Sequence, residues 1–479
     1  MYELKGLYID GEWSASSDGK TINVVDPAEE KVIGQCAAAT KEDTERAILS
    51  AQKGLDTWSK FDPWQRGEFI RRAADLMAER IDQNARATVL ETGKPLAQAK
   101  REWELAIDQF IWFSEETKRI YGRTVESRLK NGHIRVDHSP VGVVAAFTAW
   151  NFPVALVARK LAPALAAGCS VICRPSTETP ASATAMVECC HDAGIPAGVV
   201  NLLTGSASVT SPVIMQSPIV RKISLTGSTP LGKKLVRESA ETMKKVTMEL
   251  GGHGPCVIFD DANLSAALDA SVASKFGNCG QVCVSPNRFY VQSGVFEEFS
   301  HEFARKASEL VVGNGRDENV QMGPLRTAKR LAEVDELVRD AIECGAKVLV
   351  GGRPMNRDKG HYYEPTVLVD VPRNARLMHE ESFGPIAVIN RFDDFDDVIN
   401  QANDTNFGLA AYVWSQSLHL ATEASKQIKS GMVGVNTYAL ATAEAPFGGI
   451  KESGIGREGG SECLADYMNL KYTHVVTQV

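Results

Sequence analysis

From residue 141 onward the chain alternates between short apolar runs, rich in β-branched residues, and longer helical segments. Strands are predicted at 141–147, 170–173, 199–203 and 222–225, with helices at 153–167, 181–193, 208–216 and 230–242 between them. Strands that alternate with helices of this length are typical of βαβ units, which build a parallel sheet between helices. The alternation therefore predicts a doubly wound α/β domain.

A second series of the same kind begins near Glu249. Strands are predicted at 255–259, 288–291, 347–350, 366–368, 386–391 and 410–413, with helices at 264–276, 296–311, 331–343, 395–402 and 419–429 between them. A chain of 479 residues is longer than one ordinary core accommodates. We therefore expect two α/β domains of similar size, with a hinge near Glu249.

Three further segments lie outside these two series. Residues 42–116 are strongly helical, and we expect connections at 53–62 and 91–94. Residues 121–139 alternate weakly and have no apolar core of their own, and the tail 467–479 is strand-like. Such appendages often pair with each other or with a second subunit.

Composition excludes several classes of protein. The apolar fraction of 44% and charged fraction of 23% are those of a soluble globular protein, and a net charge of −8 without a basic stripe argues against nucleic-acid binding. The longest apolar stretch, 141–158, contains Asn151 and Pro153 and suits a buried strand and helix better than a membrane span. Ten scattered cysteines form no disulfide framework or zinc-site spacing. With no signal-peptide pattern at the start, these free thiols predict a cytoplasmic protein, and we expect no metal.

Cys283 and Glu249 are the first candidates for chemistry. Cys283 lies on a glycine-containing connection between a helical run and the strand near 287–291, where a thiol can face a cleft. Glu249 ends the strand-like run 245–248 and is followed by Gly251 and Gly252, which let other backbone come close. A nucleophile and a base on separate connections suit covalent catalysis.

Other candidates follow strands of the first series. Asn151 could donate its side-chain amide to a developing oxyanion, or could be a turn or helix-cap residue. The glycines and Ser228 of the segment 226–232 open a helix whose free N–H groups suit a pyrophosphate, although a plain β–α turn explains them equally well. Arg174, with the hydroxyl residues that follow it, could meet a nucleotide ribose or its phosphate, and this segment could also cap the next helix. Glu381 and Phe383 could hold ribose hydroxyls and bound a flat cofactor, or could form a surface turn.

Taken together and in this order, these motifs resemble the aldehyde dehydrogenase superfamily over essentially the whole chain. The matching motifs are Trp150-Asn151-Phe152-Pro153, Leu225-Thr226-Gly227-Ser228, Glu249-Leu250-Gly251-Gly252, Gly280-Gln281-Val282-Cys283, Glu381-Ser382-Phe383-Gly384-Pro385 and Pro446-Phe447-Gly448-Gly449. Segments 163–169, 403–412 and 454–459 resemble the succinate-semialdehyde and lactaldehyde branch most closely.

The resemblance implies a mechanism and an architecture. Cys283 would attack an aldehyde, Asn151 and the Cys283 N–H would stabilise the oxyanion, and a thioester left by hydride transfer would be hydrolysed by water that Glu249 activates. The expected cofactor-binding residues are Trp150, Arg174, Ser176, Thr177, Gly227, Ser228, Gly232, Glu381 and Phe383. Two Rossmann-like domains are implied, with the cofactor domain at 1–120 and 140–248 and the catalytic domain at 249–459. Residues 121–139 and 460–479 would form a small β element that assembles a homodimer or homotetramer.

Departures from the family pattern bear on cofactor and substrate. Arg174 stands where lysine is usual, and Thr177 where NAD-preferring members commonly have glutamate, so we expect NADP to be favoured, with NAD possible. Gly277 stands where semialdehyde members supply an arginine for the substrate carboxylate. Arg159, Arg457 and Thr442 remain as candidate substrate contacts, and His253 and Tyr438 are near them by position only. We expect a small polar aldehyde, such as a hydroxyaldehyde, a sugar-derived aldehyde or a semialdehyde, with succinate semialdehyde proper as the alternative.

Two rival interpretations belong to other functional classes. A cysteine hydrolase or acyltransferase without redox chemistry would need a histidine paired with Cys283, and none of the nine histidines lies in a motif that suggests one. A catalytically silent scaffold is disfavoured because Cys283, Glu249 and Asn151 are all present.

Overall fold

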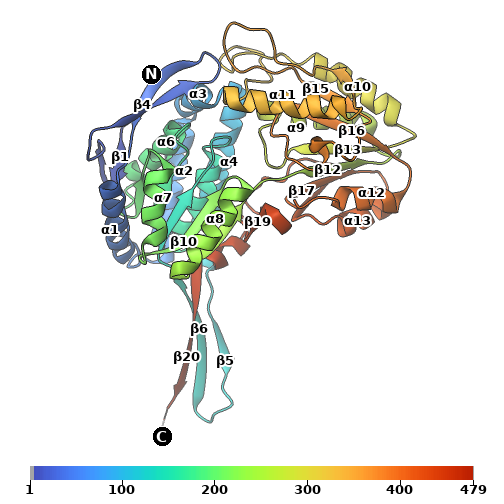
Figure 1. Cartoon of the computed structure of the whole chain (residues 1–479). Helices are drawn as coiled ribbons and strands as arrows, with labels where there is room; N and C mark the ends of the chain where they lie inside the picture. The colour runs from blue at the N-terminus through green and yellow to red at the C-terminus, as the bar shows by residue number, and fades with distance from the viewer. Residues whose placement is uncertain (1–4, 478–479) are drawn as a thin grey trace.

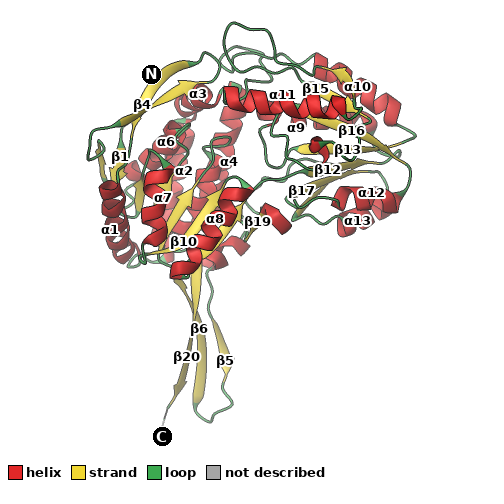
Figure 2. Cartoon of the chain, in the orientation of Figure 1, coloured by secondary structure: helices red, strands yellow, loops and turns green. Residues whose placement is uncertain are grey.

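The computed structural model describes residues 5–477, which form two helix-covered sheets and a long antiparallel arm (Figures 1 and 2). Both large sheets are parallel except at their edges. The fold is therefore the expected pair of Rossmann-like domains with a small β element.

The first sheet has the strand order β19-β11-β10-β7-β8-β9-β1-β2. Its strands are β1 (Leu7–Ile9), β2 (Glu12–Ser14), β7 (Val143–Phe147), β8 (Ser170–Arg174), β9 (Val200–Leu202), β10 (Val220–Thr226), β11 (Lys245–Glu249) and β19 (Gly454–Ile455). On one face lie α1 (Lys41–Trp58), α7 (Ala207–Gln216) and α8 (Thr229–Ser239). On the other lie α5 (Ala155–Ala166) and α6 (Pro180–Asp192), with α2 (Pro63–Glu79), α3 (Ile81–Thr92) and α4 (Leu96–Glu116) packed around them. Helices on both faces explain why the central strands are continuous apolar runs.

The second sheet has the order β14-β15-β16-β13-β12-β17-β18. Its strands are β12 (Gly254–Ile258), β13 (Pro286–Gln292), β14 (Lys347–Val350), β15 (Thr366–Val369), β16 (Ile386–Phe392), β17 (Ala410–Trp414) and β18 (Met432–Val435). Figure 1 shows α9 (Leu264–Phe276), α10 (Phe296–Ser308) and α11 (Ala328–Glu343) above this sheet, and α12 (Phe395–Asn403) and α13 (Leu418–Gln427) below it.

The strand order of the first sheet reverses between β7 and β10. From β7 the chain moves outward through β8 and β9, and then returns to place β10 on the other side of β7. Ligands of open α/β sheets bind at the carboxyl ends of the strands at such a reversal. Asn151 follows β7 and Gly227 follows β10, so both lie at this point.

The arm is a three-stranded antiparallel sheet that projects from the body (Figure 1). The tail strand β20 (Met468–Val476) pairs along its whole length with β6 (Gly132–Pro140), which also pairs with β5 (Arg123–Glu126). Of the two pairings expected for the appendages, with each other or with a second subunit, the structure shows the first.

One expectation about local structure was wrong. The connection expected at 53–62 is mostly helix, because α1 continues to Trp58. Gly54 lies inside this helix because a Cβ there would overlap the backbone of Gly198, so the glycine permits close packing and does not break the helix. The short strands β1, β2, β3 (Thr21–Asp26), β4 (Lys31–Ala37) and β18 were not expected, because none has an apolar run long enough to predict a strand.

In the part of the chain that the structure describes, no helix has the length and apolar character that crossing a membrane requires.

Candidate active site

A cleft of about 490 Å³ lies between the carboxyl ends of β7 and β10 and the loops that enter the second sheet. Seven of the sequence-predicted residues line it: Trp150, Asn151, Gly227, Ser228, Cys283, Glu381 and Phe383. The rings of Trp150 and Phe383 meet edge to face with centroids 5.7 Å apart. Motifs spread over more than two hundred residues thus converge on one site.

The loop before Cys283 has an unusual backbone. Asn278, Cys279 and Gly280 are all left-handed, with φ values of 50°, 57° and 68°. This conformation costs a residue with a side chain roughly 1–2 kcal/mol, so the surrounding structure must hold the loop. Glycine is needed at position 280 for two reasons: its φ is positive, and a Cβ there would overlap the carbonyl group of Gly384.

Asn151 is held from three directions. Its carbonyl oxygen accepts hydrogen bonds from Lys94 Nζ at 2.8 Å and from Asn278 Nδ2 at 3.0 Å. Its own Nδ2 donates to the carbonyl oxygen of Gln281 at 3.0 Å. An amide has two N–H groups, so one contact to the cysteine loop leaves the other for a ligand oxygen.

Lys94 and Glu102 were not among the sequence-predicted residues. Their side chains are 1% exposed and form an ion pair at 2.5 Å. The second carboxylate oxygen of Glu102 accepts from the backbone N–H groups of Val154 at 2.7 Å and Ala155 at 3.1 Å, where α5 begins. A carboxylate at a helix N-terminus is stabilised by the free N–H groups and the helix dipole. The pair therefore fixes the turn that carries Asn151.

Glu249 ends β11, between Thr226 of β10 and Gly454 of β19. Its side chain is buried, and within the described residues neither carboxylate oxygen has a hydrogen-bond partner. Burial, followed by the negative charge of Glu458, raises the pKa of Glu249 well above its ordinary value. Ser453 holds the segment that follows Glu249 by two hydrogen bonds. Its carbonyl oxygen accepts from Leu250 N, and its Oγ donates to the Gly251 carbonyl oxygen at 2.7 Å.

The segment after Glu249 lies directly against the cysteine loop. A Cβ on Gly252 would overlap the carbonyl oxygen of Cys283, so glycine is needed for this approach. Gly252 N also donates to Glu381 Oε1 at 3.0 Å. Burial raises the pKa of Glu381 to about 7. Burial, with the charges of Glu381 and Glu249, raises the pKa of the Cys283 thiol to about 12, so in this form the thiol keeps its proton at neutral pH.

A second buried ion pair joins Lys160 and Glu458 close to Glu249. Lys160 Nζ also donates to Thr226 Oγ1 at 2.7 Å. Sequence reasoning missed both residues, because a lysine beside Arg159 in a helix and a glutamate in a glycine-rich segment carry no distinct signal.

The predicted ribose-binding segment follows β8 and lies outside the cleft lining. Arg174 is buried and donates to the carbonyl oxygen of Gly205 at 2.7 Å, and burial lowers its pKa to about 10. Ser176 and Thr177 are half-buried in the following turn. Gly232 lies one turn inside α8, where a Cβ would overlap the Leu250 side chain, so this glycine permits helix–strand packing.

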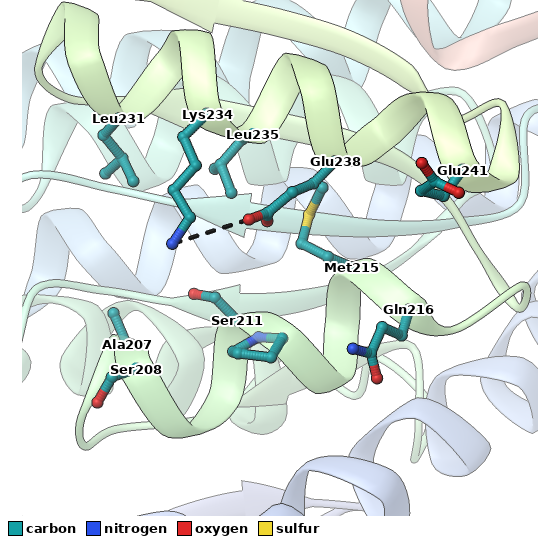
Figure 3. A pocket seen from close by; sticks show the side chains of 11 residues that line it. Ala207, Ser208, Ser211, Met215, Gln216, Leu231, Lys234, Leu235, Glu238 and Glu241 are labelled. Atoms are coloured by element: carbon teal, nitrogen blue, oxygen red, sulfur yellow. Dashed lines mark ion pairs between the residues drawn. The ribbon is translucent and has the colours of Figure 1, made fainter.

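A groove of about 510 Å³ separates α7 from α8 (Figure 3). Pro212 and Met215 line it from α7, and Leu231 and Leu235 from α8, with the Lys234–Glu238 ion pair at its side. Ser228, the N-cap residue of the same helix α8, lines the cleft, so the groove is placed to continue the cleft along one helix.

The predicted substrate contacts have unequal surroundings. Arg159 is buried with its guanidinium 4.0 Å from the Phe447 ring centroid, and it is close enough to Cys283 and Glu249 to interact electrostatically with both. Arg457 donates to the carbonyl oxygens of Gly449 at 2.9 Å and Gly456 at 2.7 Å, and the Thr442 carbonyl accepts from Gln109 Nε2 at 3.3 Å. At Gly277 a Cβ would meet no atom of the described residues within 4 Å.

Comparison with known proteins decides the family. The model of the aldehyde dehydrogenase family matches residues 13–473. The chain belongs to the aldehyde dehydrogenase family. It is 44% identical to an NADP(+) succinate-semialdehyde dehydrogenase of Escherichia coli, over 97% of this chain and 96% of that protein. It is 43% identical to a 3-sulfolactaldehyde dehydrogenase of Pseudomonas putida, over 98% of each. A crystal structure described as an E. coli NADP-dependent enzyme superposes with a TM-score of 0.97, at 43% identity over 99% of this chain and 98% of that one.

This aldehyde dehydrogenase therefore catalyses the NAD(P)-dependent oxidation of a small aldehyde. The two rival interpretations, a hydrolase without redox chemistry and a silent scaffold, lose their support. The name of one relative also agrees with the predicted use of NADP.

The raised pKa of Glu249 predicts a pH-dependent effect of Glu249→Gln on stability. The folded carboxyl keeps its proton to higher pH than the unfolded one, so its stabilising contribution is complete at low pH. That contribution is lost as pH rises from the ordinary pKa of 4.5 toward the folded pKa, by about 1.4 kcal/mol per pH unit. The glutamine cannot ionise. The quantity to compare is the melting temperature of the variant minus that of the native protein. We expect this difference to be larger at pH 8 than at pH 5 by at least about 2 °C. Equal differences at the two pH values would contradict the assignment.

Proposed function

We propose that this dehydrogenase converts a small polar aldehyde to its carboxylate through a covalent intermediate on Cys283. The observation that carries this proposal is the convergence of Cys283, Asn151 and the cofactor-side residues on one cleft, with Glu249 on the adjoining strand. A hydroxyaldehyde, a sugar-derived aldehyde and a semialdehyde all fit the chemistry. Succinate semialdehyde itself remains the alternative.

Each residue has a separate task in the proposed reaction. The Cys283 thiol, protonated in the free protein, would lose its proton to solvent when a cationic nicotinamide ring lies beside it, and the thiolate would then add to the aldehyde carbon. Asn151 Nδ2 with the Cys283 N–H would stabilise the oxyanion of the thiohemiacetal. The residues around the cleft would hold a nicotinamide whose chemistry is to accept the hydride, and loss of that hydride from the thiohemiacetal carbon would leave a thioester on Cys283. Glu249 then takes a proton from water, whose oxygen attacks the thioester and releases the acid and the Cys283 thiolate.

We propose NADP as the favoured cofactor, with NAD also used. Arg174 Nε is a buried donor without a hydrogen-bond partner among the described residues. Thr177 brings no carboxylate of its own to repel a 2′-phosphate, and the carboxylate of the next residue, Glu178, lies 3.4 Å from Arg326 Nε. Trp150, Gly227, Ser228, Glu381 and Phe383 would hold the nicotinamide and pyrophosphate end. The apolar groove between α7 and α8 suits the adenine, and Ser176 would complete the ribose site.

Formation of reduced cofactor with a panel of aldehydes tests this proposal. We expect turnover with lactaldehyde, glycolaldehyde or an aldehydic sugar, and kcat/KM with NADP at least equal to that with NAD. The Cys283→Ala variant should lose all turnover, whereas Glu249→Gln should keep a single-turnover burst and lose steady-state hydrolysis. A preference for NAD of about tenfold or more would contradict the cofactor assignment, and hydrolysis of esters without cofactor reduction would revive the hydrolase.

Gly277 provides a direct test of substrate choice. The open space beside its Cα can take a longer side chain, so Gly277→Arg would add a cation at the start of the loop that leads to Cys283. One charged hydrogen bond is worth about 1.5–3 kcal/mol, so kcat/KM for succinate semialdehyde should rise roughly tenfold or more relative to glycolaldehyde. Gly277→Met is the matched control, with similar length and no charge. An equal change with both variants would contradict this role.

The arm is proposed to assemble the oligomer. We retain residues 121–139 and 460–479 as this element, between a cofactor domain at 1–120 and 140–248 and a catalytic domain at 249–459. Leu470 and Tyr472 of β20 share one face and are 70% and 62% exposed, which an isolated subunit gains nothing from. We expect sedimentation to show a dimer or tetramer that Leu470→Asp with Tyr472→Asp converts to monomer. A native monomer would contradict the proposal.

We also propose a cytoplasmic location, which the ten free cysteines support.

A further inference from the structure

Arg326 lies between the two domains, one residue before the Thr327 cap of α11. It is 5% exposed, and its backbone and its side chain face different loops. An arginine buried at a domain interface orders whatever it contacts, because its planar guanidinium offers several donors in fixed directions.

The backbone of Arg326 contacts the nucleophile loop. Its N–H donates to Gln281 Oε1 at 2.9 Å, and Gln281 Nε2 donates to the Asn278 carbonyl at 3.0 Å. The Gln281 carbonyl in turn accepts from Asn151 Nδ2 at 3.0 Å. Gln281 therefore joins Arg326 to the amide that would stabilise the oxyanion and to the left-handed turn before Cys283.

The guanidinium of Arg326 contacts the loop after β8. One nitrogen donates to the Glu178 carbonyl at 2.9 Å, and Nε lies 3.4 Å from Glu178 Oε2. Glu178 N donates to Ser176 Oγ at 3.3 Å, so the same turn includes the hydroxyl residues assigned to the cofactor ribose. A continuous series of polar contacts thus runs from Ser176 through Glu178, Arg326 and Gln281 to Asn151.

We propose that Arg326 is a positioning residue that couples occupancy of the 2′-phosphate end of the cofactor site to the reactivity of Cys283. A 2′-phosphate beside Arg174 and Thr177, with its ribose at Ser176, fixes the turn that carries Glu178, and Arg326 transmits that order to Gln281. The inference rests on the cofactor position proposed above. It adds a link between cofactor recognition and the nucleophile that needs no direct contact between the two.

Adenosine 2′,5′-bisphosphate is the probe that separates this coupling from direct contact. It carries the 2′-phosphate and the adenosine, but it has no nicotinamide to cover Cys283. The measurement is the rate of iodoacetamide alkylation of Cys283, followed by mass spectrometry of its peptide, with and without saturating probe. We expect the probe to change the native rate by about threefold or more, within the range that such networks carry.

Arg326→Met removes the guanidinium and keeps the backbone N–H to Gln281, so we expect the probe to leave its alkylation rate nearly unchanged. Arg326→Lys restores one donor and should recover part of the effect. Glu178→Gln, which weakens the contact from the other side, should reduce the effect independently and covers the case of a poorly folded Arg326 variant.

Arg316→Met is the matched control. Arg316 also lies within 4 Å of carboxylates of the first domain, Asp26 at 3.3 Å and Glu29 at 3.6 Å, but it touches neither loop. This variant should keep the native response. A native response in both Arg326→Met and Glu178→Gln, or a native Cys283 that ignores bound probe, would overturn the inference alone. Failure of the probe to bind the native protein in calorimetry would overturn the cofactor assignment as well.

Discussion

The buried ion pair between Lys94 and Glu102 is the interaction on which the site depends most directly. Removing two charges from water is costly, and it is offset only where both groups have all their hydrogen bonds. Glu102 meets this condition by capping α5, and Lys94 by holding the Asn151 carbonyl and lying 4.3 Å from the Phe152 ring centroid. The turn that carries Lys94 also contacts the second domain. Leu96 N donates to the Gly315 carbonyl oxygen, and the missing side chains of Gly315 and Gly323 leave room for the backbone of this turn. One ion pair thus positions the proposed oxyanion donor Asn151, the start of α5 and a contact between the domains.

Desolvation explains why the site holds its reactive groups in protonated form. Burial raises the pKa of Cys283, Glu249 and Glu381, and the charges of Glu381 and Glu249 raise the pKa of Cys283 further. Nearby cations such as Arg159 act in the opposite direction without cancelling these effects. A cationic ring placed between Glu381 and Cys283 would reverse both effects by stabilising the carboxylate and the thiolate. Without such a ring, the charges of the protein keep Cys283 as a thiol. We therefore expect the thiolate to form when the cationic cofactor ring is bound.

The sequence predicted most of the framework and the residues facing the cleft, because periodicity and turn motifs are local signals. It predicted β11, α9 and the convergence of Cys283 with Asn151, yet it ended α1 too early because Gly54 resembles a helix breaker. Glu102 could not be found this way, since its importance comes from Val154, which is 52 residues distant. Arg326 and Glu178 are likewise 148 residues apart. The need for glycine at position 232 cannot be predicted locally, because it comes from the Leu250 side chain packed against it. Long-range partners decide these roles.

The strand β19 and Ser453 close the edge of β11 beside Glu249, and Glu458 supplies the partner of Lys160. All three come from a segment near the carboxyl end of the chain. Domains fold largely in the order in which the ribosome delivers them. The first sheet can therefore form early in synthesis, but Glu249, the proposed base, remains at an open sheet edge until residues 453–458 have emerged. Synthesis of these residues would therefore be the step that completes the surroundings of the proposed reactive centre.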